Sequence, residues 1–295
     1  MSAPAWSYGA VLLAPVALTA LLVSEGWPLM PAGLAATAVQ VAALGWMELR
    51  FPRTPGRPFL RDRGALQDAA HGALLLLATK ALEPVVGAAV PVLGPGIWPS
   101  AWSPFAQGLL YLALVDLLEY GRHRLMHTWA WLWPIHAIHH DIDALHASRK
   151  HRFHVGEALV RAALITAPVA LLGAPVALAT VQVLALNMVG YPAHASVDWR
   201  LPGWLHRALV TPDVHHLHHD SRRAVHDSNY GALLPVWDVL FGTFTEPSRR
   251  SVGRYGVEGP APPPDLAGQL LYPLTALRRA VSMLATSRSP REPPP

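Results

Sequence analysis

The sequence contains no cysteine and few charged residues. Without cysteine the chain cannot form disulfides, zinc ribbons or cysteine-held iron–sulfur clusters, and it cannot ligate haem through a thiolate. Only 14% of its 295 residues are charged and 52% are hydrophobic, whereas a soluble domain has about 25% charged residues. It also lacks the lysine-rich runs with interleaved aromatics that are typical of nucleic-acid binding. These absences indicate that much of the chain is solvated by lipid.

Several uncharged segments are long enough to cross a membrane. Residues 1–24 and 26–47 carry no charged side chain, and about 20 apolar residues span the hydrocarbon core. The first segment lacks the basic start of a signal peptide, so we expect a retained span. Two further spans are expected near 71–93 and 105–118, and the uncharged stretch 162–197 predicts a short helical hairpin. We therefore predict an all-α fold, a polytopic transmembrane helical bundle of about four spans plus this hairpin.

The distribution of arginine predicts the topology. Five arginines lie in the loop after the second span and mark the cytoplasmic side: Arg50, Arg53, Arg57, Arg61 and Arg63. Two more spans return the chain to that side, and the hairpin starts and ends there, so histidines on either side of the hairpin can meet. We expect N-terminal spans over 1–104, a catalytic domain over 105–246, and a Pro/Arg-rich tail over 247–295. Within the tail, residues 266–284 predict an amphipathic interfacial helix.

Most of the 16 histidines lie between His123 and His219, and they form four groups. The groups are His123-x-x-x-His127, His136-x-x-His139-His140, the isolated His194, and His215-x-x-His218-His219. Helical residues three or four apart share a face, and imidazole nitrogens bind first-row metals at about 2 Å. Burying so many unpaired imidazoles near a membrane would be costly. Metal binding is therefore favoured over a purely structural role.

The residues alone do not identify the metal. Structural zinc sites usually take four ligands, commonly with cysteine, whereas this chain offers at least nine imidazoles. Such a set suits two ions, and iron, copper, zinc and nickel all accept imidazole ligands.

The spacing of these groups resembles that of a known family. Asp116-x-x-x-Tyr120-x-x-His123-Arg124-x-x-His127, Leu132-Trp133-x-x-His136-x-x-His139-His140 and Thr211-Pro212-Asp213-x-His215-x-x-His218-His219 are similar to the three histidine boxes of the fatty acid hydroxylase / sterol desaturase superfamily. Arg152-Phe153-His154-x-x-Glu157, His194-Ala195-Ser196, Ser228-Asn229-Tyr230-Gly231 and Trp237-Asp238-x-x-Phe241-Gly242-Thr243 resemble its other signatures. Val155 and Ser196 replace the proline and asparagine that are usual there.

The resemblance implies a membrane di-iron enzyme that uses O2 to hydroxylate or desaturate a lipid. It implies two iron ions, a separate reductase, cytochrome or ferredoxin as electron donor, and a cytoplasmic helical cap that carries the boxes. The implied ligands are His123, His127, His136, His139, His140, His215, His218 and His219, with His194 as a ninth. His154 is a candidate tenth ligand, or alternatively a residue that supports a ligand or lines the substrate channel. High alanine, arginine and proline with little lysine suggests a bacterial source, and hence the inner membrane.

The remaining polar residues have weaker assignments. We expect His216 to support its neighbours rather than bind metal, and His146, His151, His206 and His226 to lie in loops or at the surface. Candidates to orient a ligand imidazole are Asp116, Asp141, Asp143, Glu157, Asp213 and Asp238. The alternative function is a histidine-rich membrane metal-binding or metal-transport protein without oxygenase activity, which would place its ligands inside the spans along a path. A structural or sensor protein with a degenerate site is a third reading, which the intact boxes disfavour.

Overall fold

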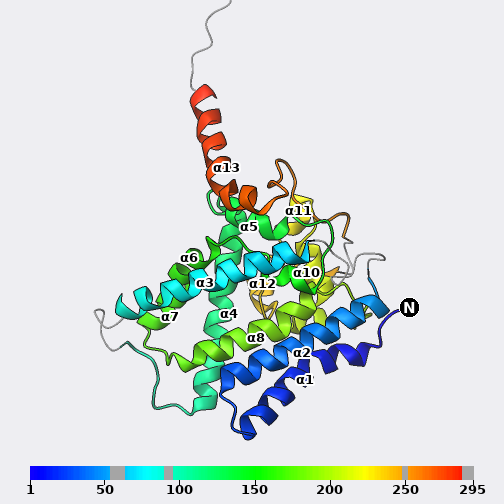
Figure 1. The fold of residues 1–295 in the computed structure, drawn as a ribbon, viewed down its shortest axis with the longest axis vertical. Coiled ribbons are helices and arrows are strands. Elements are labelled where there is room, and N and C mark those ends of the chain that lie inside the picture. Colours follow the sequence, from blue (N-terminus) through cyan, green and yellow to red (C-terminus); the bar gives the residue numbers. More distant parts are fainter. Residues whose placement is uncertain (54–63, 90–95, 248–251, 288–295) are drawn as a thin grey trace, which may run out of the picture.

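A computed structural model describes residues 1–53, 64–89, 96–247 and 252–287, and this part of the chain is helical with no β-strand. The long helices are α1 (Ala5–Ser24), α2 (Leu29–Arg50), α3 (Ala65–Ala89), α4 (Pro104–Thr128), α8 (Ala177–His194) and α13 (Leu266–Ser287) (Figure 1). The short ones are α5 (Trp133–His140), η3 (Ala147–His151), α6 (Glu157–Arg161), η4 (Ala162–Thr166), α7 (Ala167–Leu171), α9 (Leu205–Ala208), α10 (Pro212–His218), α11 (Arg223–His226) and α12 (Val236–Leu240). The predicted all-α class is confirmed.

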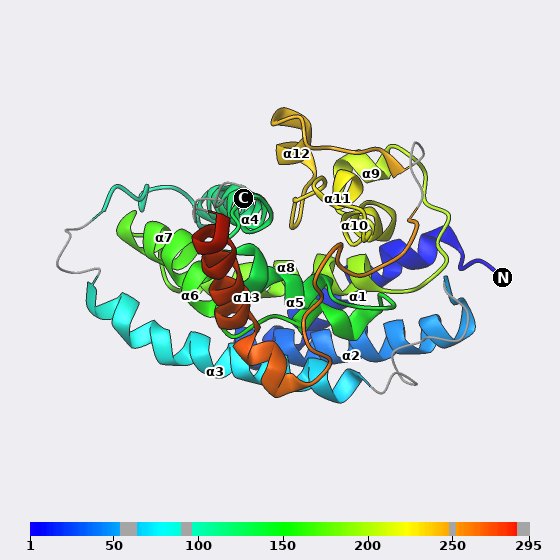
Figure 2. The same ribbon diagram turned by 90° about the horizontal axis from the view of Figure 1, so that it is seen from above.

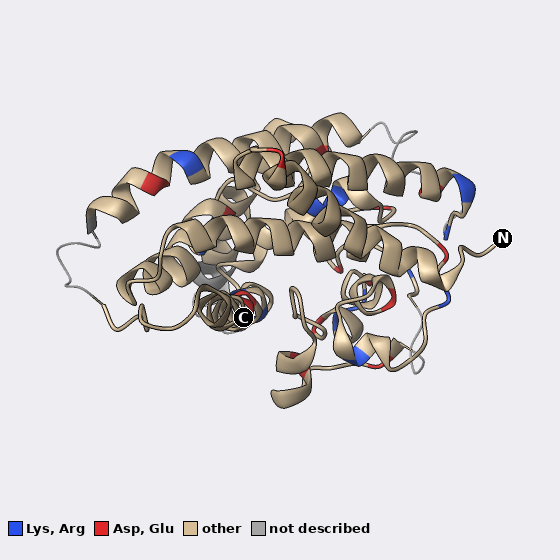
Figure 3. Ribbon diagram, turned by 90° about the horizontal axis from the view of Figure 1, so that it is seen from below, with Lys and Arg blue, Asp and Glu red and all other residues tan. Residues whose placement is uncertain are grey.

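Three of the described helices, α1, α2 and α3, are long and apolar enough to cross a membrane. Figure 3 shows why, because the long helices carry few charged residues along their length. Helix α4 contains the fourth predicted span but is not one of these three. It crosses α1, α2, α3 and α8 steeply, since it stands upright in Figure 1 and is seen almost end-on in Figure 2. The fourth span therefore stays a prediction.

The hairpin predicted over 162–197 is present as two helical arms. Helices α6, η4 and α7 follow one another without a break, and η4 is a π-helical turn. The chain then reverses at Gly173, whose φ of +81° is a conformation that favours glycine. Helix α8 returns and ends at His194. The hairpin is confirmed, and its position relative to a membrane stays a prediction.

The start of α1 and the end of α2 meet the same segment, which follows His194. Ala3 forms an isolated β-bridge with Trp199, and Pro52 forms one with Val197. Helix α1 also packs on α2, and both pack on α8. The start of α1 and the end of α2 therefore lie next to each other, beside the segment that follows His194.

The tail packs on the rest of the fold. Its predicted amphipathic helix is α13, whose Tyr272 lies in a small core with Ala137 and Ile138 of α5. Gln269 of α13 also hydrogen-bonds His71 of α3 at 2.8 Å. Beyond these first turns α13 projects from the body (Figure 1). Arg57, Arg61 and Arg63 of the predicted cytoplasmic loop lie outside the described residues.

Candidate metal centre

Three short helical segments present the histidine boxes to one interior point. His123 and His127 are one turn apart at the end of α4, and both are buried. Helix α5 carries the second box in its last two turns. Helix α10 carries the third, and its N-cap Thr211 accepts a hydrogen bond from the Val214 backbone N–H. The packing of α4 against α5, and of α10 against α8, brings distant boxes together.

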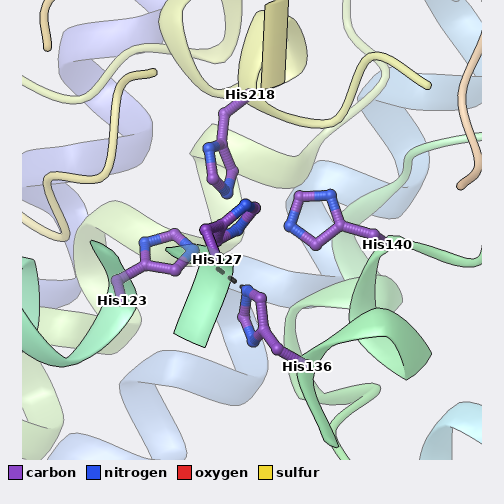
Figure 4. A group of neighbouring side chains, drawn as sticks. All are labelled: His123, His127, His136, His140 and His218. Carbon is purple, nitrogen blue, oxygen red and sulfur yellow. Dashed lines mark hydrogen bonds between the residues drawn. The ribbon is translucent and has the colours of Figure 1, made fainter. Parts of the chain in front are cut away.

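The first histidine group draws on all three boxes. One ring nitrogen from each member lies within 4.8 Å of the corresponding nitrogens of the others, and all five members are buried: His123, His127, His136, His140 and His218. Figure 4 shows the five rings arranged around a common centre. Such an arrangement of imidazole nitrogens can hold one metal ion.

The second histidine group adjoins the first. Its members also lie within 4.8 Å of one another and are buried: His139, His194, His215 and His219. The two groups touch, because the rings of His140 and His219 stack with centroids 4.5 Å apart. The structure thus brings together the nine imidazoles expected from the boxes and His194, divided as five and four.

Hydrogen bonds at Nδ1 aim several of these rings. The Nδ1 atoms of His218, His123 and His194 lie 2.8, 2.9 and 2.7 Å from the backbone carbonyls of Ser228, Tyr230 and Gly190. Carbonyl oxygen can only accept, so each Nδ1 carries the proton and each Nε2 is left with a lone pair. This is the tautomer that binds a metal through Nε2.

The inward-facing nitrogens lack protons to share. His136 Nδ1 lies 2.7 Å from the Glu157 carboxylate, so His136 also turns an unprotonated Nε2 inward. That atom lies 3.0 Å from Nε2 of His123. Two lone pairs at this separation repel unless a cation lies between them. In addition, both ring nitrogens of His140 and Nε2 of His218 are buried without a hydrogen-bond partner among the described residues. The donor set therefore fits a pair of bound metal ions.

Burial keeps these imidazoles neutral. Desolvation, reinforced by neighbouring imidazoles, lowers the pKa of His127, His140 and His219 well below the usual value of 6.5. A neutral imidazole is the metal-binding form.

The structure does not bring His154 into either group. Its Nε2 lies 3.0 Å from the Leu270 carbonyl of α13, and its Nδ1 accepts the Gly156 N–H. His216 also turns away, with Nδ1 2.7 Å from the Tyr255 hydroxyl and Nε2 3.2 Å from the Ala195 carbonyl.

The expectation that the other histidines lie in loops or at the surface is only partly right. His146, in the loop before η3, is fully buried, whereas His151 in η3 is only half-buried. His206 and His226 lie on α9 and α11 and are buried. They are buried because the segments around the boxes pack into one interior.

Among the carboxylates considered from the sequence, Glu157 contacts a box histidine directly. It is buried between His136 and Arg122, whose Nη1 donates to it at 2.6 Å. Desolvation raises the pKa of Glu157, but Arg122 and His136 outweigh it, so that pKa lies below its usual value. Arg122 also pairs with Glu119, which pairs with Arg161. A buried chain of alternating charges thus supports His136.

Asp238 acts through the backbone. It accepts the N–H groups of Tyr230 and Gly231 at 2.8 and 2.7 Å, and the Tyr230 carbonyl in turn accepts from His123. Asn229 holds the same turn in a left-handed conformation, with φ of +57°.

Asp227 was not identified from the sequence as a candidate residue of the site. Its carboxylate lies 3.4 Å from Nδ1 of His127 and 3.5 Å from Nε2 of His226, and the three residues form a third metal-capable group. No box spacing marks Asp227, because its position depends on the fold of α11. Four other candidate carboxylates show no contact with the nine imidazoles among the described residues: Asp116, Asp141, Asp143 and Asp213. Asp116 instead accepts hydrogen bonds from the Leu233 and Leu234 backbone N–H groups.

The site and the fold define a class: a membrane helical protein with two adjoining histidine clusters able to bind metal. The model of the fatty acid hydroxylase family matches residues 108–243. The chain is 33% identical over 210 residues to ornithine lipid hydroxylase OlsE of Rhizobium tropici, covering 68% of this chain and 63% of that protein. It is 29% identical over 163 residues to human alkylglycerol monooxygenase, covering 55% and 35%.

A more distant relative is the very-long-chain aldehyde decarbonylase GL1-6 of rice, 26% identical over 174 residues, covering 54% of this chain and 26% of the relative. No solved structure matches the chain. The chain spans less than two thirds of the length of each of these relatives. The chain belongs to the fatty acid hydroxylase / sterol desaturase superfamily, and the matched segment contains all three histidine boxes.

Proposed function

We propose that this protein is a membrane-bound oxygenase that uses two iron ions and O2 to hydroxylate a membrane lipid, with electrons from a separate reductase, cytochrome or ferredoxin. The observation that carries the proposal is the convergence of nine buried imidazoles in two touching groups. The names of two relatives, a lipid hydroxylase and a monooxygenase, favour hydroxylation over desaturation.

The proposal gives each histidine group one iron. His123, His127, His136, His140 and His218 would hold the first, and His139, His194, His215 and His219 the second. Iron bound there supplies activation of O2 for oxidation of a C–H bond. The chain's own groups fix four of the imidazoles, because the carbonyls at Ser228, Tyr230 and Gly190 and the Glu157 carboxylate accept hydrogen bonds from Nδ1–H. Burial of the imidazoles excludes water from them.

The arrangement of the histidines argues against a metal transporter. A transport path would be expected to distribute ligands along the membrane-spanning helices. Here the described histidines of both groups lie outside α1, α2 and α3, and they enclose one interior centre. We also propose an inner-membrane location with this centre on the cytoplasmic side, supported by the arginines that follow α2.

A pair of adjacent histidines gives a matched test. His215 belongs to the second group, whereas His216 bonds Tyr255 and Ala195 outside it. We expect purified wild-type protein and His216→Gln to hold two irons per chain, and His215→Gln to hold at most one. Metal analysis measures the content. O2 consumption with a reductant and a total lipid extract, followed by mass spectrometry of the lipids, measures the reaction.

The two variants also separate folding from ligation. Loss of metal in His216→Gln alone, or two irons retained in His215→Gln, would contradict the ligand assignment. Two irons without any lipid gaining 16 mass units, the mass of one oxygen atom, would contradict the hydroxylase proposal.

A further inference from the structure

A lysine lies against the helical hairpin that ends at His194, which has no charged residue of its own between 162 and 197. Lys150 and Lys80 are the two lysines of the chain. Lys150 Nζ donates to the Asn187 Oδ1 of α8 at 2.9 Å and lies 5.0 Å from the centre of the Tyr191 ring. Its stem crosses Gly190, where a Cβ would come within 2.6 Å of Lys150 Cε. A glycine on α8 therefore leaves room for this side chain.

Among the described residues, Lys150 forms no ion pair with a carboxylate, and its one hydrogen bond is to the neutral side-chain amide of Asn187. Desolvation lowers the pKa of Lys150 to about 7. The charge of Lys150 also makes the largest contribution to the lowered pKa of the adjacent His151. A desolvated cation is costly unless an anion approaches it.

Neighbouring groups can also donate hydrogen bonds. The Asn187 amide nitrogen and the Tyr191 hydroxyl form no hydrogen bond within the described part of the chain, and neither belongs to its buried polar atoms without a partner. Together with the other protons of the Lys150 ammonium, they offer several donors and one positive charge. An anionic oxygen group satisfies such a set, because charge-assisted hydrogen bonds are the strong ones.

The position of Lys150 links the apolar helices to the histidine centre. Element η3, which carries Lys150, packs against α2, α3 and α8. On α8, Gly190 accommodates the lysine stem, and its carbonyl accepts a hydrogen bond from Nδ1–H of His194. Asn187 precedes His194 by seven residues, about 10 Å along a helix. A single lipid molecule could thus contact Lys150 and still reach the second histidine group.

We propose that Lys150, Asn187 and Tyr191 bind the anionic oxygen group, a carboxylate or a phosphate, of the lipid that is oxidised at the histidine centre. This inference rests on the proposed function, which it deepens by naming the substrate class. The lipid carries its negative charge about two helical turns from the carbon-oxidising centre. Lys150 is a specificity-determining residue that contacts substrate away from the reacting carbon.

The test measures binding by the iron-loaded protein in detergent without reductant, so no turnover occurs. The probes are N-palmitoylglycine, its methyl ester, and lysophosphatidic acid. We expect wild-type protein to bind one of the two anionic probes on the order of 10- to 100-fold more tightly than the ester. This factor is the usual gain in affinity from a hydrogen bond to a charged group. Preference for N-palmitoylglycine identifies a carboxylate, and preference for lysophosphatidic acid identifies a phosphate.

Two variants and one control decide the outcome. Lys150→Met removes the cation, and Asn187→Asp supplies an internal carboxylate that competes for it, so both should lose the anion preference. Lys80→Met changes the other lysine, which pairs with Glu83 in an exposed position, and should keep it. Iron content reports folding of each variant.

An anion preference retained in a folded Lys150→Met or Asn187→Asp, or absent from wild type, would overturn this site while leaving the oxygenase proposal untouched. An intact preference in a wild-type protein that oxidises no lipid would instead contradict the oxygenase proposal alone.

Discussion

Each histidine of the centre is useful only if its ring is held in one tautomer and one direction. For four of the nine imidazoles the chain achieves this with groups that accept a hydrogen bond from Nδ1–H. Three are backbone carbonyls, at Ser228, Tyr230 and Gly190, and one is the Glu157 carboxylate. Glu157 differs from the carbonyls because it places a full negative charge against the His136 ring.

Glu157 gives a prediction at the level of one atom. Replacing Glu157 with Gln keeps the shape and an acceptor oxygen but removes the charge that Arg122 and His136 share. We expect iron affinity to fall about 10- to 100-fold, the usual cost of losing such a supporting partner. Competition with a chelator of known affinity measures the change.

A surface glutamate serves as the control for that substitution. Glu258 is exposed and accepts only a backbone N–H from Arg223 in the described contacts, so Glu258→Gln should leave iron affinity unchanged. Equal affinities for Glu157→Gln and wild type would show that the carboxylate does not support His136.

The sequence predicted the imidazoles of the centre better than their supports. Box spacing and the resemblance together marked the nine imidazoles that the structure gathers into two groups, and they set apart His216, which the structure places outside both groups. The carbonyl of Ser228 could not be foreseen, because every residue has a carbonyl and only the fold selects one. Asp227 was not marked because only the fold brings its carboxylate to His127. His154 was a candidate tenth ligand, but both its ring nitrogens form hydrogen bonds outside the two groups.

At the level of elements, buried carboxylates join the apolar helices to the histidine-bearing segments. Glu48 near the end of α2 accepts the backbone N–H groups of Ala147 and Ser196 at 2.9 and 3.0 Å. Ser196 lies two residues beyond His194, so this contact fixes the exit of α8. These contacts hold α2 to the chain on both sides of the hairpin.

Asp68 in the first turn of α3 makes a stronger connection, and it can be tested. It is buried and pairs with Arg149 at 2.7 Å and Arg152 at 3.1 Å. Asp68→Ala would leave two buried guanidinium groups without this carboxylate, and removing one partner of a buried pair costs about 3–5 kcal/mol. We expect a clear fall in the unfolding temperature in detergent, measured by light scattering or intrinsic fluorescence.

A surface carboxylate supplies the control. Glu25 lies exposed in the turn between α1 and α2, and substitutions at such positions usually change the free energy of unfolding by no more than about 0.5 kcal/mol. Glu25→Ala should therefore unfold near the wild-type temperature. Similar losses for both variants would mean that α3 is not held through Asp68.

The elements were predicted unevenly, for physical reasons. Uncharged length predicted α1, α2 and both arms of the hairpin, since these helices are selected by an apolar environment. The direction of α4 was not predictable from its composition. Its second half carries the first box and must meet α5, which turns the helix steeply across α1, α2, α3 and α8 (Figure 2). Hydropathy predicts whether a helix is surrounded by lipid or by water, but it does not predict the angle at which the helix crosses its neighbours.

At the level of the whole molecule, folding confines a large set of imidazoles to one dry interior. Desolvation lowers the pKa of His123, His127, His139, His140 and His218 well below 6.5. In the unfolded chain the same side chains would titrate near 6.5. Folding therefore depends on these groups staying unprotonated.

This dependence predicts acid sensitivity of the metal-free protein. Between the lowered folded pKa values and 6.5, the unfolded state binds more protons, so stability rises with pH. The stabilisation is fully present above pH 6.5 and is lost as pH falls below it, by up to about 1.4 kcal/mol per imidazole for each pH unit. We expect the unfolding temperature of metal-free protein to hold from pH 8 to 7 and to fall steeply from 6.5 to 5.5. Iron-loaded protein should keep its unfolding temperature to lower pH, because bound metal excludes protons from the same nitrogens. A metal-free protein equally stable at pH 5.5 and 8 would mean that its imidazoles are not held neutral in a common interior.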